Sequence, residues 1–195
     1  MKLSRYKRLI IVGAGPSGIG LGILLEKLGF TSYIILEADT IGSSCINWPD
    51  EMKLITPSFT GQGFGSLDLN AITPGTSPAY SFRKEHLSGK EFGDYLSLLT
   101  NHFQLNIEEN QMVYSVEKSE GKFTLETDSD TWTCDALIWA TGEFNFPKVE
   151  SLKGSQFGLS NRFTSSYKEI ENGEHIVIGG GESGLDAAYH LSNNG

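Results

Sequence analysis

The sequence contains few cysteines, few basic residues and no long uninterrupted apolar segment. Cys45 and Cys134 are its two cysteines among 195 residues. They are too few for a disulfide framework, which favours a reducing compartment. Lysine and arginine number 15 against 24 aspartates and glutamates, a net charge of −9. A nucleic-acid binder needs a basic face and an anionic membrane attracts basic segments, so this charge argues against both partners.

The apolar segment from Leu9 to Leu25 follows several basic residues and so superficially resembles a signal peptide. It contains five glycines and Pro16, and Glu26 and Lys27 follow it without a nearby small-x-small cleavage site. It is also shorter than the roughly 20 residues that a membrane-spanning helix needs. We therefore expect a cytoplasmic protein.

The chain begins with a pattern typical of a βαβ unit. Leu9–Val12 is a short apolar run, as in a strand buried on both faces of a parallel sheet. Gly13–Gly18 follows it, and apolar residues then recur at helical spacing up to Leu28, before Gly29. Tyr33–Leu36 is a second buried strand. The crossover between the two strands should be right-handed.

The middle of the chain combines a long loop with one helix. Residues 38–87 are irregular, with a glycine cluster at Gly61–Gly65, and loops of this length are often functional. Ser88 and Glu91 match a capping box that begins a helix. The apolar stripe of that helix consists of Phe92, Tyr95, Leu96, Leu99 and Phe103.

The pattern after this helix predicts an antiparallel meander at about residues 105–134, with Trp132 on its third short strand. Ala136–Ala140 should then return to a buried strand, which ends in Thr141 and Gly142. After a polar connector at 143–174, Ile176–Ile178 should form a strand that leads into a second glycine turn and helix.

Two glycine turns carry the strongest functional signal. Gly13, Gly15 and Gly18 fit G-x-G-x-x-G, and the motif recurs at Gly179, Gly181 and Gly184. The first glycine permits a tight turn, the second lets a pyrophosphate approach the backbone, and the third lets helix and strand pack closely. The helix N-terminus then offers free N–H groups to the phosphate. Each turn follows a β-branched run and begins an amphipathic helix, which is the context that the motif requires.

Glu37 strengthens the first site. It lies nineteen residues after Gly18, at the end of the second strand, where an acidic residue can accept hydrogen bonds from the ribose of an adenosine. A solvated carboxylate at a strand end is the alternative, and Asp39 is the local competitor. The second turn is followed by no residue that would distinguish NADH from NADPH before Gly195.

These features together resemble the flavoproteins with two dinucleotide-binding domains, which include the thioredoxin- and glutathione-reductase-like enzymes and the flavin-containing monooxygenases. The resemblance implies an α/β fold: a three-layer, Rossmann-like FAD domain with an inserted meander at residues 1–168, and the beginning of an NAD(P)H domain at 169–195. It implies an enzyme that oxidises NAD(P)H through bound FAD, with NADPH favoured, and passes electrons to a disulfide, a quinone or dioxygen. The residues it places at FAD are Gly13, Gly15, Pro16, Ser17, Gly18, Glu37, Val113, Thr141 and Gly142. Those it places at the nicotinamide cofactor are Gly179, Gly181, Glu182, Ser183 and Gly184.

Within this superfamily the residues resemble the monooxygenase-like members, and a flavoprotein similar to the bacillithiol disulfide reductases fits about as well. Trp48, in Asn47–Asp50, resembles an aromatic residue near the flavin, with ordinary core packing as the alternative. Cys45 stands where some disulfide reductases have the first of two cysteines, but Asp50 takes the place of the second. A dithiol shuttle needs two thiols, so Cys45 could act only with an external thiol, or it fills space beside the flavin. The Baeyer–Villiger fingerprint is not met, since Phe163 stands where its histidine belongs.

The four histidines lack zinc-site spacing, so no metal is expected. The expected partners are a small-molecule substrate or a low-molecular-weight thiol, with a homo-oligomer as an open alternative. From Ile176 only 20 residues remain, fewer than the 30 or so of a βαβ unit. We therefore expect an incomplete second domain, in a fragment of a longer enzyme or as a non-catalytic nucleotide-binding module, with its last strand and helix lacking sheet partners.

Overall fold

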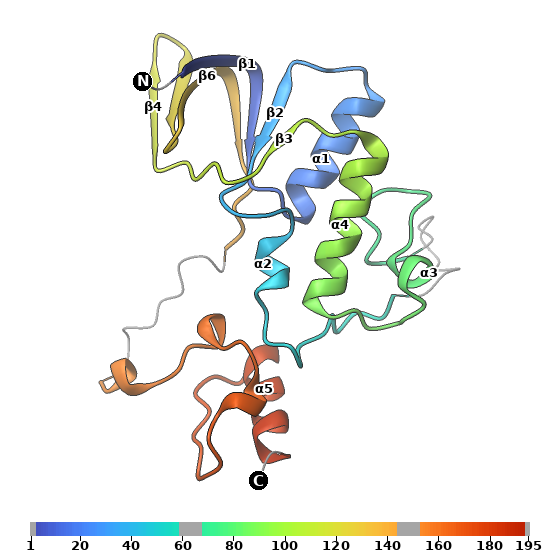
Figure 1. Cartoon of the computed structure of the whole chain (residues 1–195), viewed down its shortest axis with the longest axis vertical. Coiled ribbons are helices and arrows are strands. Elements are labelled where there is room, and N and C mark those ends of the chain that lie inside the picture. Colours follow the sequence, from blue (N-terminus) through green and yellow to red (C-terminus); the bar gives the residue numbers. More distant parts are fainter. Residues whose placement is uncertain (1–2, 59–67, 144–152, 194–195) are drawn as a thin grey trace.

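The computed structural model describes residues 3–58, 68–143 and 153–193 (Figure 1). Six strands form one sheet in the order β3-β2-β1-β6-β5-β4. The strands are β1 (Leu3–Val12), β2 (Tyr33–Leu36), β3 (Ile107–Glu108), β4 (Ser115–Ser119), β5 (Lys122–Glu126) and β6 (Asp130–Trp139). The glycine cluster of the sequence, at Gly61–Gly65, lies outside the residues that the structure describes.

The parallel half of the sheet is built around β1. It pairs with β2, with Val12 opposite Leu36, and with β6, with Val12 opposite Trp139. β3 extends this half beyond β2 in the same direction. All four residues of β2 are buried, as the uninterrupted apolar run predicts for a central strand of a parallel sheet.

Helices α1 (Pro16–Lys27) and α4 (Gly89–Phe103) cover one face of this half. Alternate strand residues point toward them, and Ile11 and Ile35 join a core cluster with Ile19, Ile23 and Leu96. The Ser88 hydroxyl accepts the Glu91 N–H and the Glu91 carboxylate accepts the Ser88 N–H, so the predicted capping box is confirmed. Two short helices in the expected loop were not predicted: α2 (Ser43–Ile46) and α3 (Pro78–Phe82).

The antiparallel strands β4 and β5 continue this sheet beyond β6, and β5 packs over the face of β1 and β2 that points away from the helices. Ile10, Val12 and Ile34 point away from the helices and pack with Leu125 and Trp132 in a second core cluster. This arrangement, with helices, central sheet and antiparallel strands in three layers, confirms the predicted fold class of the first domain.

The meander prediction needs a correction at β6. The third meander strand and the returning strand are one ten-residue strand, because Thr131–Cys134 pair with β5 on one side while the whole strand pairs with β1 on the other. The predicted burial of Ala136–Ala140 is also wrong, since Trp139 is 55% exposed and Ile138 37%. Among the described residues, β5 ends its pairing with β6 at Cys134, so the run beyond it has a neighbour on one edge only.

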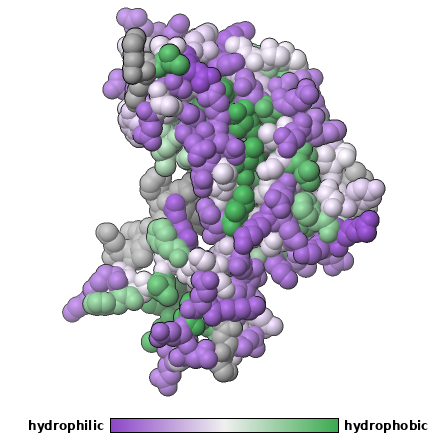
Figure 2. All heavy atoms as spheres, in the orientation of Figure 1, coloured by the Kyte–Doolittle hydropathy of each residue, from purple (hydrophilic) through white to green (hydrophobic). Residues whose placement is uncertain are grey.

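The C-terminal part consists of three short 3-10 helices, η1 (Ser155–Phe157), η2 (Asn161–Phe163) and η3 (Tyr167–Glu169), and helix α5 (Glu182–Ser192). The expected strand at Ile176–Ile178 is absent from the part of the chain that the structure describes, and Ile176 is 91% exposed. Figure 2 shows separate apolar patches between polar areas on this part of the molecule. No described helix has the length and apolar character that crossing a membrane requires.

Candidate functional site

The candidate site lies where β1, β2 and β6 end. Because these strands are parallel, their carboxyl ends meet at one edge, which is where open α/β sheets bind ligands. The Gly13 N–H donates to the Leu36 carbonyl at 2.8 Å, and the Ala140 N–H donates to the Val12 carbonyl at 2.8 Å. These bonds bring the first glycine turn, Glu37 and the Thr141–Gly142 segment to the same edge.

Backbone contacts explain why the first turn requires glycine at two positions. Gly13 has φ +108°, and a Cβ there would lie 2.4 Å from the Ala140 carbonyl oxygen. A Cβ at Gly18 would lie 1.9 Å from the Gly13 carbonyl oxygen. Gly15 caps α1 without a side-chain hydrogen bond and Pro16 occupies the first turn, so backbone N–H groups of this turn remain available to an anion. Ser17 is exposed beside them.

Glu37 is buried at the end of β2 and is already oriented. One carboxylate oxygen accepts the Ala14 N–H at 2.7 Å, and the other accepts the Asp39 N–H at 3.1 Å and the Ser43 hydroxyl at 3.3 Å. A carboxylate has about four acceptor positions, so Glu37 retains room for a further donor. Asp39, the competing residue, is exposed past the strand end.

Sequence reasoning missed Ser44 at this site. Its hydroxyl lies 3.9 Å from the position of a Cβ on Gly15, so it faces the turn where the motif places a pyrophosphate. The signal that could have found it is a serine pair directly after Gly42. Gly42 has φ +73°, and its N–H donates to the Ala14 carbonyl at 3.1 Å, which holds the start of α2 against the turn.

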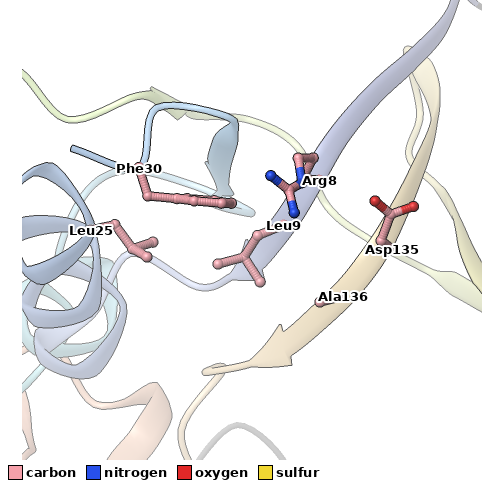
Figure 3. Close-up of a pocket in the computed structure, with 6 residues that line it drawn as sticks. All are labelled: Arg8, Leu9, Leu25, Phe30, Asp135 and Ala136. Carbon is pink, nitrogen blue, oxygen red and sulfur yellow. The ribbon is translucent and has the colours of Figure 1, made fainter. Parts of the chain in front are cut away.

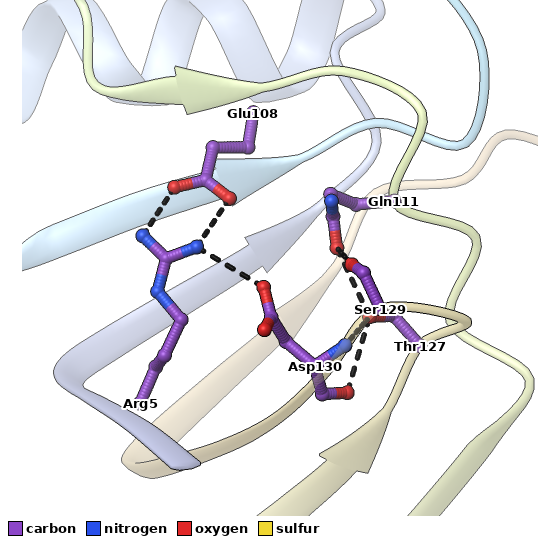
Figure 4. Close-up of polar contacts among 6 residues, drawn as sticks. All are labelled: Arg5, Glu108, Gln111, Thr127, Ser129 and Asp130. Atoms are coloured by element: carbon purple, nitrogen blue, oxygen red, sulfur yellow. Dashed lines mark hydrogen bonds and ion pairs between the residues drawn. The ribbon is translucent and has the colours of Figure 1, made fainter. Parts of the chain in front are cut away.

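A polar cluster positions the segment that contains Val113 (Figure 4). The Arg5 guanidinium pairs with both carboxylate oxygens of Glu108 and lies 3.2 Å from the Asp130 carboxylate. Gln111 accepts the Thr127 hydroxyl at 3.0 Å, and its N–H donates to the Glu37 carbonyl at 2.7 Å. Gln111 is therefore held beside Glu37, and Val113, two residues further on, packs against the second core cluster.

Cys45 and Trp48 lie beside α4. Cys45 is 6% exposed, and burial raises the pKa of its thiol. Since the thiolate is the reactive form, this environment suits a space-filling residue better than a nucleophile. The Trp48 ring lies 3.2 Å from the position that a Cβ on Gly89 would take. Trp48 is partly exposed, and it packs against the first core cluster.

The second glycine turn has the backbone geometry of the first. Gly179 has φ +119°, and a Cβ at Gly184 would lie 2.1 Å from the Gly179 carbonyl oxygen. Gly181 caps α5 without a side-chain hydrogen bond, and Glu182 and Ser183 are exposed in the first turn of the helix. A Cβ added at Gly179 would meet no described atom within 4 Å, whereas Gly13 is enclosed by Ala140.

A shallow apolar hollow of about 290 Å³ lies elsewhere, between the end of α1 and the sheet (Figure 3). Leu9, Leu25, Phe30 and Ala136 supply its apolar wall, and Arg8 and Asp135 lie at its margin. Leu9 and Ala136 precede the strand ends by three residues, so this hollow is separate from the glycine turn.

A three-layer domain with a glycine turn at its sheet edge, followed by a second such turn, defines the class of two-dinucleotide flavoproteins. Comparison with known proteins gives the family. The sequence profile of the pyridine nucleotide-disulphide oxidoreductases matches residues 10–195, so the chain belongs to this family.

Individual relatives include both monooxygenases and reductases. The chain is 31% identical to senecionine N-oxygenase of Tyria jacobaeae, over 97% of this chain and 45% of that protein. Bacillithiol disulfide reductase Bdr of Staphylococcus aureus shares the fold with a TM-score of 0.79 at 24% identity, over 98% of this chain and 55% of that one. A flavin monooxygenase mutant from Stenotrophomonas maltophilia gives 0.77 at 23% identity, over 97% and 55%. The chain spans about half the length of the curated relatives it matches.

Proposed function

We propose that the protein is an FAD-dependent oxidoreductase that oxidises NAD(P)H. The observation that carries this proposal is the pair of glycine turns with matching geometry, one of them enclosed beside a buried, oriented glutamate. Membership of the pyridine nucleotide-disulphide oxidoreductase family supports it independently. We assign residues 1–168 to the FAD domain and 169–195 to the beginning of the NAD(P)H domain.

The first turn fits the FAD pyrophosphate. Gly15 leaves space beside the Ser44 hydroxyl, and α1 offers uncapped N–H groups at its first turn, including that of Ser17. Glu37 would accept a hydrogen bond from the ribose, the backbone near Val113 would contact the adenine, and Thr141 and Gly142 would pass close to the flavin. Gly181, Ser183 and Gly184 would hold the pyrophosphate of the nicotinamide cofactor, with Gly179 forming the turn and Glu182 beside it.

When bound, the flavin would supply the redox chemistry, accepting a hydride from NAD(P)H and passing electrons to the acceptor. The protein residues bind and orient the two nucleotides at their turns. The 31% identity to senecionine N-oxygenase favours a monooxygenase-like reaction on a small molecule. NADPH is the favoured donor, and a homo-oligomer remains an alternative assembly. The two free, buried cysteines support a cytoplasmic location.

The absorption spectrum of the purified protein tests this function. We expect a flavin band that bleaches when NADPH is added without oxygen. Glu37→Gln should weaken FAD binding about tenfold, because an acceptor for charge-assisted hydrogen bonds is lost. Asp39→Asn is the matched control, since its exposed side chain lies two residues away, and it should bind FAD as the wild type does. A colourless protein that takes up no added FAD would refute the proposal, and binding without flavin reduction would favour a non-catalytic nucleotide-binding module.

Cys45→Ser tests the alternative of a disulfide reductase that works with an external thiol. Because burial raises the pKa of the Cys45 thiol, we expect flavin reduction and any disulfide turnover to continue unchanged in the variant. Loss of disulfide turnover with normal flavin reduction would instead assign the reductase chemistry to Cys45.

A further inference from the structure

One segment of the first domain contacts the C-terminal part of the chain directly. This segment runs from Trp48 to Met52. It turns at Pro49, whose carbonyl accepts the Met52 N–H at 2.9 Å. Figure 1 shows the chain after α2 approaching the C-terminal part. The Asp50 N–H donates to the Ser165 carbonyl at 2.9 Å, which joins the two backbones.

Glu51 makes the strongest polar contacts across this junction. One of its carboxylate oxygens accepts the Ser166 hydroxyl at 2.6 Å, and the other accepts the Tyr167 N–H at 3.0 Å. Ser166 and Tyr167 are both buried, although Glu51 itself is partly exposed. Although burial opposes it, this pair of hydrogen bonds holds the pKa of Glu51 below its ordinary value, so the carboxylate is charged at neutral pH.

Tyr167 connects this junction to the second glycine turn. Its ring stacks on His190 of α5, with centroids 5.8 Å apart and planes 10° apart. Its hydroxyl bonds to Asn161, and the Asn161 amide lies 3.4 Å from the Met52 sulfur. Gly181 caps α5, so a chain of contacts runs from Glu51 through Tyr167 and His190 to the helix that follows the second turn.

We propose that Glu51 is a positioning residue for hydride transfer. It holds Tyr167, and through Tyr167 helix α5 and the second glycine turn, at a fixed orientation to the segment that contains Trp48. Hydride transfer depends on the distance and alignment of the two reacting rings, so a loosened junction lowers the rate at which a bound nucleotide reacts. It leaves nucleotide binding at Gly179–Gly184 intact. This inference rests on the proposed function.

The test compares Glu51→Gln with Asp50→Asn in the FAD-loaded protein. Asp50 is an adjacent acidic residue whose exposed side chain pairs with Lys90 at 2.8 Å, while its contact to Ser165 uses the backbone. We expect the rate of flavin reduction at saturating NADPH to fall about tenfold in Glu51→Gln, as loss of hydrogen bonds to a charged group implies. The NADPH concentration for half-maximal rate and the bound FAD should stay within about threefold of wild type. Asp50→Asn should match the wild type.

Hydrogen exchange gives a readout independent of turnover. The Tyr167 amide and the amides of α5 should exchange faster in Glu51→Gln and remain as in wild type in Asp50→Asn. Ser166→Ala removes one of the two donors and should give an intermediate loss of rate, which keeps the test available if Glu51→Gln does not fold. Tyr167→Phe keeps the ring and the N–H and should retain most of the rate.

The outcomes separate the two proposals. A wild-type flavin that neither NADPH nor NADH reduces would refute the proposed function. A wild-type flavin that is reduced, with Glu51→Gln and Ser166→Ala as fast as Asp50→Asn, would overturn the positioning role alone. A loss confined to the half-saturating concentration would also overturn it, because that result would place Glu51 in nucleotide binding.

Discussion

Replacing Gly18 with alanine should destabilise the protein even though alanine favours helices. A Cβ at this position would lie 1.9 Å from the Gly13 carbonyl oxygen, and real Cβ atoms essentially never approach closer than 3.0 Å. The two groups must therefore separate by at least about 1.1 Å. Gly13 cannot move freely, because it lies so close to Ala140 that a Cβ added to Gly13 would be 2.4 Å from the Ala140 carbonyl oxygen.

The loss of unfolding free energy in Gly18→Ala is the balance of two opposing effects. Overpacking a rigid site costs about 1–3 kcal/mol, and the change from glycine to alanine within a helix returns up to about 1 kcal/mol. We expect a net loss of about 1–2 kcal/mol in the free energy of unfolding. A Cβ at Gly20, two residues along the same helix, would lie 3.3 Å from Ile72 Cγ2 and 3.8 Å from the Ile72 carbonyl oxygen. Gly20→Ala therefore needs a shift of only a few tenths of an ångström and should cost far less than Gly18→Ala.

Gly184→Ala completes the comparison. The local clash is the same, 2.1 Å from the Gly179 carbonyl oxygen, but the open surroundings of Gly179 allow the second turn to shift. We expect a cost below about 0.5 kcal/mol, reduced further by the gain in helix propensity. Urea unfolding followed by far-UV circular dichroism without added FAD measures all three variants. The steric reasoning is refuted if Gly18→Ala is as stable as Gly20→Ala.

Two further predictions concern charged side chains. Arg5→Met should lower the free energy of unfolding by about 1 kcal/mol, measured by urea titration. Glu108 and Asp130 lose the cation that they share, at a site where the Arg5 side chain is 35% exposed. Arg8→Met, at an exposed arginine, is the control, and an equal or larger loss in that variant would contradict the prediction. Burial raises the pKa of Glu51, but the hydrogen bonds from Ser166 and Tyr167 outweigh it and lower the pKa below 4.5. The contribution of Glu51 to stability is therefore present above pH 4.5 and is lost as the pH falls through the pKa of the folded state. The stability difference between wild type and Glu51→Gln should therefore be largest at neutral pH and vanish in acid, and a difference that grows on acidification would show that the sign is wrong.

The elements with a strong periodic pattern could be predicted from the sequence. β2, α1 and α4 follow the apolar spacing, and the capping box at Ser88 marks the start of α4. The order of the strands and the burial of β6 could not be predicted in the same way. An apolar run such as Ala136–Ala140 indicates a strand, but its burial depends on which elements cover it. In the described structure, one edge of this run has no β5 partner.

In the candidate site, too, local features could be predicted from the sequence and contacts between distant segments could not. The glycine motifs identify both turns because each glycine meets a local steric requirement within a few residues. Ser44 and Glu51 were not found, since their roles depend on contacts between segments that are distant in the sequence. Glu51 lies 115 residues before Ser166, and no local pattern records that proximity.

The pairing of β1 with β6 has a consequence for synthesis of the protein. Val12 and Trp139 are opposite each other, so the last neighbour of β1 leaves the ribosome 127 residues after it. At about 5–20 residues per second, the wait lasts roughly 6 to 25 s. Contacts this distant also slow folding, because the intervening chain must first be closed into a loop. β2 can pair with β1 early, but the other edge of β1 stays open during elongation, the interval in which a nascent chain is most exposed to aggregation and to chaperone binding.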